Sequence, residues 1–398
     1  MAITRACYAT REQVRRALDV QQSAYHDAII DRKIQSASGS VDRLCMRKFY
    51  PEIKTYNWDW PNYQYAYPWR LWLDQRELAG QPSVVLSGPF LTNPITISPD
   101  DYILQPQSGP PYTSIQLRRD KNVAFGNNTT PQYDIQVTGP YGYWIQTEPA
   151  GSLAAAVSTA SQTSVEIGPS GLVDAGATLV VGSERMLVTD NQYVSTGISF
   201  ISGCTANSAA DNTMVVPDGT QFSAQEVILV DSEWMLIQNV IGNRMIVKRA
   251  YSGSVLAAHS PTTIWAKRQL TVVRGFLGTT AAAYPDNTSV SIDVYPELVN
   301  ELTVAETIMS LIQESQGYAN QMQANWFGQS QRGEGQQAES FPGPGINDLR
   351  ARVCEAYARQ ARSRVVLWDS KLTWTLTARG RCLTEAGRIS SSHTSRLS

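Results

Sequence analysis

Internal repetition constrains the fold of this 398-residue chain more than any other feature. The segment VVGSERMLV at residues 180–188 matches LVDSEWMLI at residues 229–237, an offset of 49 residues. Self-similarity at a fixed spacing is the signature of a structural unit that is copied within one chain. The match therefore predicts two pairs of strands that share one design.

A second set of matches follows the first. Residues 247–254 (VKRAYSGS) recur as residues 272–279 (VVRGFLGT) at an offset of 25, and both segments continue through a pair of alanines to a ring, His259 or Tyr284. We expect a strand, a turn that needs glycine, a small-residue stretch close to backbone, and then another strand. A weaker third copy begins at GCTA, residues 203–206, where DNTMV at 211–215 also matches DNTSV at 286–290 at an offset of 75.

These copies bear on whether Ser254 and His259 are a catalytic nucleophile and base. Catalysis of that kind needs a serine, a base and an orienting group within hydrogen-bond reach of one another. The copies keep the glycines and small residues but lose the reactive groups, which become Thr279 and Tyr284 in one copy and Cys204 and Ala209 in the other. The two remaining histidines, His26 and His393, lie in distant segments. We therefore expect a structural element and no enzyme.

The repeated arginines and the composition point the same way. Arg249 and Arg274 are expected to be exposed or to cap carbonyls, because no glycine-rich loop leads from them into a helix N-terminus that could hold phosphate. The five cysteines form no C-x-x-C pair and have no histidine at ligand spacing, so no metal or other cofactor is expected. The sequence contains no apolar run of 18 residues, so a membrane partner is not expected either.

Charge is distributed unevenly along the chain. The formal net charge is only -2, but residues 1–54 carry 10 Lys and Arg against 6 Asp and Glu, and residues 346–398 carry 10 against 4. The ends are therefore basic and the middle is acidic. The two ends therefore differ electrostatically from the middle of the chain.

Both ends have helical patterns. Thr10 followed by Gln13 is a capping box that opens a short helix through Leu18, and apolar residues at steps of three and four predict a second helix over residues 23–46, ended by Pro51. Near the other end the same periodicity predicts a helix over residues 296–326.

A last helix is expected after a Gly/Gln/Pro-rich loop at residues 328–345. Asn347 is its expected cap, and Ile346, Leu349, Val353 and Tyr357 are its apolar side. The rest of this helix is rich in arginine, which makes it the most basic element that the sequence predicts. Residues 371–398 lack periodicity and are expected to be a partly disordered tail.

Between the ends, residues 69–143 contain short alternating runs (RLWLD, SVVLSG, DDYILQP, TSIQLRR and YDIQVTG) separated by turn residues. They predict a small antiparallel β unit. Its aromatic entry, YNWDWPNYQYAYPW at residues 56–69, favours a packed or interface surface over a ligand pocket, because it lacks convergent polar groups.

The outer parts of the chain resemble the head–tail connector, or adaptor, proteins of long-tailed bacteriophages. The resemblance rests on YATREQVRRAL, IQSASGSVDRLCMRKFYP, DDYILQP, PPYTSIQLRRD and IQVTGPYGYW, in that order over about 150 residues. The matching positions are Ala37, Asp42, Arg47, Phe49, Pro51, Asp101, Tyr102, Leu104, Pro106, Val137, Thr138, Gly139, Gly142 and Tyr143. The family usually continues from its Gly-Tyr strand directly into C-terminal helices, whereas this chain inserts about 150 residues of repeats.

The expected fold class is therefore α+β: a helical connector core, a small antiparallel β unit and an inserted all-β repeat domain. The expected divisions are residues 1–54, the N-terminal part of the core; 55–150, the β unit; 151–295, the repeats; 296–370, the C-terminal helices; and 371–398, the tail.

The resemblance implies a structural virion protein in the neck, assembled in the host cytoplasm. It would form a ring, expected to be a dodecamer, that docks on the portal protein and links the DNA-filled head to a stopper or tail-terminator protein. The candidate residues facing the portal, or making non-specific contact with packaged DNA, are Arg350, Arg352, Arg359, Arg362 and Arg364. Two alternatives stay open. One is that these arginines only form a solvated helix face; the other is that the chain is a virion-surface or host-glycan-binding protein whose repeats make the contacts.

Overall fold

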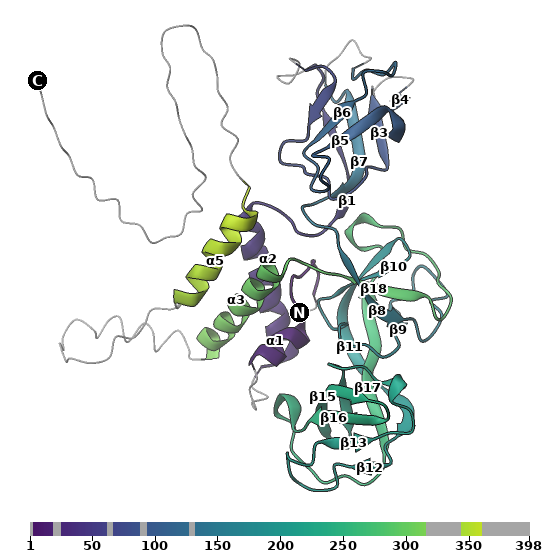
Figure 1. Ribbon diagram of the computed structural model, residues 1–398, viewed down its shortest axis with the longest axis vertical. Coiled ribbons are helices and arrows are strands. Elements are labelled where there is room, and N and C mark those ends of the chain that lie inside the picture. Colours follow the sequence, from purple (N-terminus) through teal and green to yellow (C-terminus); the bar gives the residue numbers. More distant parts are fainter. Residues whose placement is uncertain are drawn as a thin grey trace, which may run out of the picture.

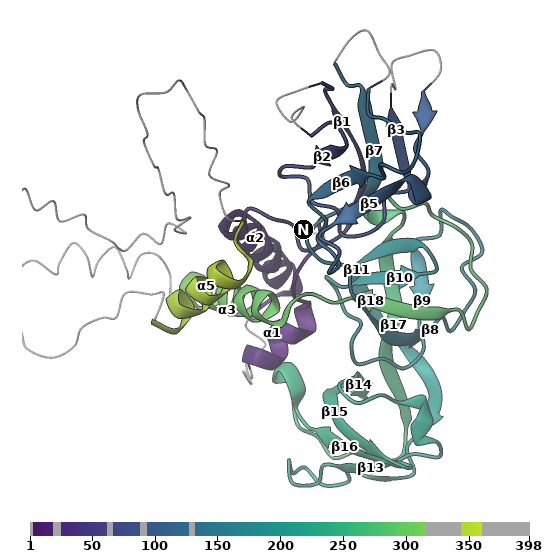
Figure 2. The ribbon, with the colours of Figure 1, turned by 45° about the horizontal axis from the view of Figure 1, so that its top comes forward.

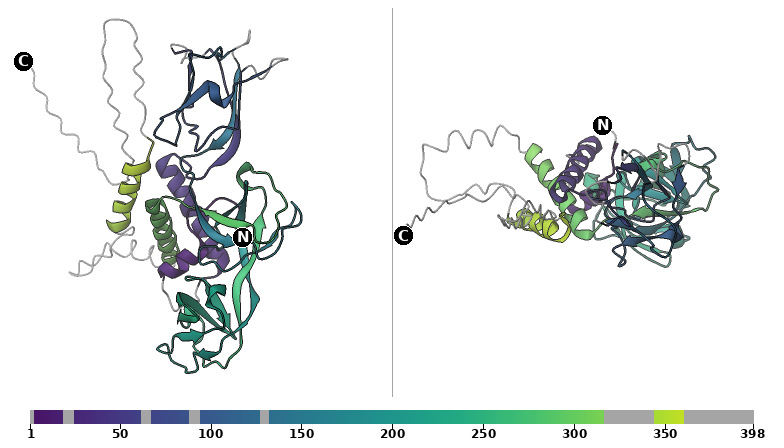
Figure 3. Two further views of the ribbon diagram at one scale, coloured as in Figure 1. Left: turned by 45° about the vertical axis from the view of Figure 1, so that its right-hand side comes forward. Right: turned by 90° about the horizontal axis from the view of Figure 1, so that it is seen from above.

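The computed structural model describes residues 3–18, 25–61, 67–87, 94–126, 132–315 and 344–359. Over these residues the chain is mixed α and β, with four helices and three antiparallel sheets. The β structure forms three bodies in a column, and the helices lie beside the middle body (Figure 1). The views in Figure 3 show the helices along one side of that column. No helix in these segments is long and apolar enough to span a membrane.

The helical unit joins the two ends of the chain. It consists of α1 (Arg11–Leu18), α2 (Asp27–Cys45), α3 (Glu297–Ser315) and α5 (Pro344–Tyr357), with α3 packed between α2 and α5. The expected capping box is confirmed, because the Thr10 N–H donates to Gln13 Oε1 at 2.9 Å and the Gln13 N–H donates to Thr10 Oγ1 at 3.3 Å. Helix α2 ends where Met46 turns left-handed at φ 51°, before Pro51 can act.

Two expectations for the C-terminal helices change. Helix α5 begins at Pro344, so Asn347 lies inside it and is not its cap, because the turn carrying Ile346 already packs on the aromatic cluster beneath. Observed α5 contains two arginines and two carboxylates, Arg350, Arg352, Asp348 and Glu355, so it is not the strongly basic helix that we predicted. Residues 316–326 of the expected third helix, residues 328–343 of the expected loop and the tail at 371–398 lie outside the described residues.

The β unit is the uppermost body in Figure 1 and is turned forward in Figure 2. Its four-stranded sheet has the order β1-β7-β3-β4 and its three-stranded sheet the order β2-β6-β5. A shared apolar cluster that includes Leu71, Ile115 and Ile135 fills the space between them. The strands are β1 (Glu52–Trp58), β2 (Arg70–Trp72), β3 (Val84–Ser87), β4 (Ile95–Thr96), β5 (Tyr102–Gln105), β6 (Ser114–Leu117) and β7 (Ile135–Tyr141).

Five of these strands lie in the five predicted runs. Strands β1 and β4 were missed, because β1 merges with the aromatic entry and lacks a clear two-residue alternation, and β4 has only two residues. The entry residues Trp58 and Trp60 are buried in the apolar cluster, as the packed interpretation predicts. Tyr67, by contrast, is 57% exposed.

The repeat region is one eleven-stranded sheet that forms two lobes. Two long strands, β11 (Glu184–Ser199) and β17 (Thr263–Val273), run through both. Lobe A comprises residues 147–192 and 268–293, and lobe B comprises residues 193–267; each has its own apolar cluster. The other strands are β8 (Thr147–Ser152), β9 (Ser164–Glu166), β10 (Thr178–Val181), β12 (Ser202–Gly203), β13 (Thr213–Val215), β14 (Val227–Val230), β15 (Glu233–Ile241), β16 (Arg244–Lys248) and β18 (Ser289–Asp293).

The two lobes have the same strand register, which confirms that the repeated strand pairs share one design. Thr178 pairs with Leu187 in lobe A as Val227 pairs with Leu236 in lobe B. The agreement extends to an irregularity: the ladder slips after Val188 in lobe A and after Ile237 in lobe B. A bulge at the same place in both copies indicates one common backbone plan.

Lobe B is inserted into lobe A at the tip of a hairpin. In lobe B, β15 returns into β16 through the tight turn at Gly242 and Asn243. The equivalent pair in lobe A, Gln192 and Gln269, has all of residues 193–268 between its members. The chain order is therefore first half of A, whole of B, second half of A, which explains why the offset is 49 before the insertion and 25 after it.

The prediction of a weak third copy was wrong. Residues 213–215 form β13 and pair with β16, as β9 (residues 164–166) pairs with β17 in lobe A. The true counterpart of residues 211–215 is therefore residues 162–166, at an offset of 49, and not residues 286–290. The DNT match reflects shared turn chemistry and not equivalent positions.

Candidate functional site

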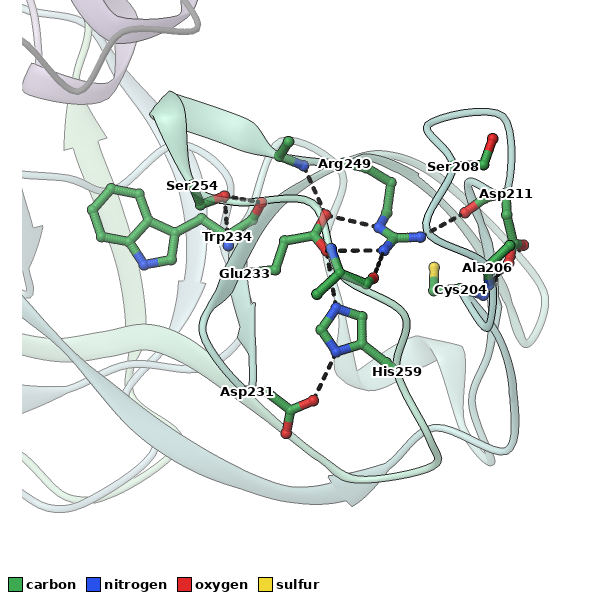
Figure 4. A network of polar contacts seen from close by, with 12 residues as sticks. Cys204, Ala206, Ser208, Asp211, Asp231, Glu233, Trp234, Arg249, Ser254 and His259 are labelled. Atoms are coloured by element: carbon green, nitrogen blue, oxygen red, sulfur yellow. Dashed lines mark hydrogen bonds and ion pairs between the residues drawn. The ribbon is translucent and has the colours of Figure 1, made fainter.

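The reactive-looking stretch that contains Ser254 and His259 forms part of a buried polar network in lobe B (Figure 4). At its centre the Glu233 carboxylate, fully buried, accepts hydrogen bonds from Arg249 Nε and Nη2 at 2.8 and 2.9 Å. It also accepts from the N–H groups of Ala250 and Ala257 at 2.7 and 3.1 Å, and lies 2.9 Å from His259 Nε2. Burial alone would raise the pKa of Glu233, but the bonds from Arg249, His259 and the backbone outweigh it and lower the pKa to about 2.

Lobe A contains the same centre. The buried Glu184 carboxylate accepts from Arg274 Nε and Nη2, both at 2.8 Å, and from the N–H groups of Gly275 and Ala282 at 2.9 and 3.1 Å. Each pair is bidentate, the geometry in which arginine and a carboxylate bind most strongly. The expectation that Arg249 and Arg274 cap carbonyls is correct: they donate to Asp211 O at 3.0 Å and Gln162 O at 2.9 Å. The alternative, that they are exposed, is wrong for both.

Ser254 has a backbone role in this network. Its Oγ accepts from the Trp234 N–H at 3.0 Å and donates to the Trp234 carbonyl at 3.2 Å. Thr279 holds Arg185 in the same way in lobe A, at 2.9 and 3.4 Å. The substitution of serine by threonine between the copies therefore preserves a hydroxyl that fastens a turn to a strand.

The His259 ring lies between two carboxylates. Its Nδ1 is 2.7 Å from Asp231 Oδ2 and its Nε2 is 2.9 Å from Glu233 Oε2, so neither nitrogen is directed at Ser254. In lobe A the equivalent of Asp231 is Gly182, where a Cβ would come within 3.2 Å of the Tyr284 ring. Lobe B thus combines histidine with aspartate, and lobe A combines tyrosine with glycine. The two positions vary together because the residues there pack against each other. The serine–histidine contact that acyl-transfer catalysis requires does not exist here.

Helix α1 fixes both lobes to the helical unit through buried charges. Arg11, 3% exposed, donates to Asp27 and Asp31 of α2 and to Asp190 of lobe A at 2.7 to 3.0 Å. Glu12, 4% exposed, accepts from the Tyr251 hydroxyl of lobe B and lies 3.6 Å from Lys267 Nζ. The repeat region is therefore held in one orientation relative to the helices.

The structure separates the five candidate arginines. Arg350 Nε donates to Glu306 of α3 at 2.8 Å, whereas Arg352 is exposed on α5. Arg359 lies just past α5, where its N–H donates to the Cys45 carbonyl at 3.1 Å and its side chain pairs with Glu77 at 3.4 Å. Arg362 and Arg364 lie outside the described residues. Arg350 and Arg359 thus hold α5 in place, which sequence reasoning missed because their partners are far away in the chain.

Arg359 also borders a cleft of about 350 Å³ at the junction of α2, β1 and the end of α5, called here the junction cleft. Its lining includes six cations, Arg43, Arg47, Lys48, Lys54, Arg76 and Arg359, and three carboxylates, Asp42, Glu52 and Glu77. This is a larger excess of positive charge than α5 itself carries. Arg43 also lines a second cleft, of about 270 Å³, beside Glu306 and Arg350.

Comparison with known proteins gives no further assignment: no protein-family model, no curated protein and no solved structure matches this chain. The described residues also contain no group of three or more histidine, cysteine, aspartate or glutamate side chains arranged to hold a metal ion.

Proposed function

We propose that this chain is a structural virion protein of the neck, a head–tail adaptor that assembles as a ring, docks on the portal and links the DNA-filled head to the stopper or tail. The observation that carries the proposal is the convergence of the residues on which the family resemblance rests. Phe49 is fully buried, and its ring meets those of Tyr143 and Tyr357 at centroid distances of 5.6 Å each. Arg47 stacks on the Tyr143 ring at 4.6 Å.

Gly142 belongs to the same junction. A Cβ at this position would lie 2.2 Å from the Tyr50 carbonyl oxygen, so only glycine allows the chain just after β7 to pass so close. The motif residues from two separate segments, together with Tyr357 of α5, therefore build one joint between the helices and the β unit. A set of scattered residues that meets at one joint supports a shared architecture better than any one motif does.

The repeats have the form of an accessory insertion. Their first and last strands pair with each other, Thr147 opposite Asp293, and the Val294 N–H donates to the Gln146 carbonyl at 2.9 Å. The chain therefore enters the repeats from the end of β7 and leaves them into α3 through neighbouring strands, as expected for a domain inserted between two elements that already pack together. This supports an adaptor core into which the repeats are inserted, while the buried contacts of α1 with both lobes bind the repeats firmly to it.

The test is assembly. The purified full chain is incubated with portal-bearing, DNA-filled heads and imaged by electron cryomicroscopy. A ring of this chain beneath the portal is the expected result. A chain that ignores portals but binds an array of host glycans would refute the adaptor function and favour the surface-binding alternative.

A deletion tests the role of the insertion. Residues 147–293 are replaced by a short glycine-containing turn that joins Gln146 to Val294. The matched control removes lobe B, residues 193–267, together with Arg268, which pairs with Glu226 of lobe B. It closes Gln192 onto Gln269 with Gly-Asn, the turn that lobe B itself uses at this register. Both variants are expected to bind portals if the repeats are accessory. Heads that bind the variant but leak DNA would assign the repeats to the seal.

A further inference from the structure

We infer that the junction cleft is a phosphate-binding site, which takes a phosphoryl group either as a free ion or as part of a nucleotide or nucleic acid. The inference stands apart from the proposed function, because it rests only on the charge and geometry of the cleft. The volume of about 350 Å³ lies within the range of pockets that hold small ligands.

The carboxylates of the cleft are already occupied. Glu52 accepts from Lys48 at 3.1 Å and from Lys54 at 2.8 Å, and Glu77 lies 3.1 Å from Arg47 and 3.4 Å from Arg359. Each of these glutamates therefore faces two cations. Asp42 accepts from the Tyr8 hydroxyl, and burial raises the pKa of Asp42 to about 6.

Two of the arginines have no carboxylate partner. Arg43, exposed at the rim, has no hydrogen-bond or ion-pair partner among the described residues. Arg76 is also exposed and uses one N–H, donated to the Asn57 carbonyl at 3.3 Å. Most donors of both guanidinium groups remain available, and each guanidinium has five.

Aromatic rings hold two of the guanidinium groups in position. Arg76 lies over the Tyr56 ring at 4.3 Å from its centroid, and Arg47 lies over the Tyr143 ring at 4.6 Å. A guanidinium that rests on a ring loses less freedom when an anion binds, which lowers the entropic cost of binding. The cleft therefore presents its positive charge in a partly fixed geometry.

The chemistry favours phosphate over a single carboxylate. Three more cations than carboxylates line the cleft, and a phosphate monoester supplies close to two negative charges and three acceptor oxygens. The guanidinium fork matches phosphate oxygens in a bidentate manner. An acidic protein segment would need several carboxylates in the same small space, where they would repel one another.

The experiment titrates the full chain with inorganic phosphate by isothermal calorimetry, and in parallel arms with a nucleoside monophosphate, a single-stranded oligonucleotide and an oligoglutamate peptide. The test variant is R43Q/R76Q, which removes the two cations that lack carboxylate partners. The matched control is R118Q/R244Q, which removes two exposed arginines outside the cleft. Circular dichroism confirms that both variants fold.

Saturable phosphate binding that weakens at least about tenfold in R43Q/R76Q, with little change in the control, is the expected result. If the nucleoside monophosphate or the oligonucleotide binds more tightly than inorganic phosphate, and R43Q/R76Q weakens that binding as well, the tighter ligand identifies the source of the phosphoryl group. Absence of saturable phosphate binding, equal weakening in both variants, or dependence on Arg43 and Arg76 for oligoglutamate alone would each overturn the inference.

Discussion

Because lobe B is inserted into lobe A, unfolding of lobe B should destabilise lobe A, whereas unfolding of lobe A should leave lobe B folded. Substitution of the buried glutamate in each lobe tests this difference. Glu233→Gln changes lobe B and Glu184→Gln makes the same change in lobe A. In each case a neutral amide replaces a carboxylate that accepts two bonds from a buried arginine and two from backbone N–H groups. Removing one partner of a buried ion pair costs about 3–5 kcal/mol because the other charge is left uncompensated.

That loss is large for units of this size. Lobe B has 75 residues, residues 193–267, and a domain of that length has a total stability of about 4–11 kcal/mol. Glu233→Gln is therefore expected to bring lobe B close to its unfolding limit. The unfolded lobe would then be a long loop between Gln192 and Gln269 of lobe A, in place of a tight turn. Closing a loop of that length costs about 2–3 kcal/mol more than closing a turn of four residues.

The expected outcome is asymmetric. Glu233→Gln removes amide hydrogen-exchange protection from lobe B and also weakens lobe A by about 2–3 kcal/mol, whereas Glu184→Gln weakens lobe A and leaves lobe B protected. Lobe B is spared because its own ends stay side by side when lobe A opens. The assay is hydrogen exchange read by mass spectrometry on peptides from each lobe. Loss of protection in lobe B after Glu184→Gln, or an unchanged lobe A around an unfolded lobe B, would refute the reasoning.

Three further outcomes test the network. The folded pKa of Glu233, about 2, lies below its ordinary value of 4.5, so Glu233 stabilises lobe B fully above pH 4.5 and loses this stabilisation as the pH falls toward 2. The free energy of unfolding in urea, measured from about pH 5 downward, should show this loss in the wild type and not in E233Q. His259→Tyr should destabilise lobe B by about 1–3 kcal/mol, and adding Asp231→Gly should restore most of it, which a double-mutant cycle measures. Ala250 is left-handed at φ 51°, as its lobe A equivalent Gly275 is at φ 60°, so Ala250→Gly should stabilise lobe B by about 1 kcal/mol in chemical denaturation.

Local pattern was sufficient for the elements that repeat or cap. The offset of 49 placed both strand pairs in their correct register, and Thr10 with Gln13 located the start of α1. The nesting of the lobes was not predicted, because an offset compares positions and does not say which strands pair across the insertion. The change from 49 to 25 was the signal, since two lobes in tandem would keep one offset throughout.

The buried centres could also have been anticipated. Glu184 and Glu233 occupy matched positions while their neighbours change, Gly182 to Asp231 and Arg185 to Trp234. An acid and an arginine that both persist between copies, while serine and histidine do not, indicate an ion pair on which the fold depends. The partners of Arg350 and Arg359 could not be predicted in this way, because each ion pair joins segments that are far apart in the chain and are not repeated.

The position of the positive charge follows from the same distinction between local and tertiary information. Basic residues near both ends of the chain suggested an arginine-rich helix face, yet α5 exposes one arginine, Arg352, beside two acids, Asp348 and Glu355. The excess appears where the two ends meet, since Arg43 and Arg47 come from α2 and its end while Arg359 comes from beyond α5. Charges that are hundreds of residues apart combine only when the helical unit closes. A partner that recognises this charge therefore recognises the folded junction, so variants that loosen α5 from outside the cleft, such as Val353→Ala in its buried apolar face, should weaken anion binding without removing a single cation.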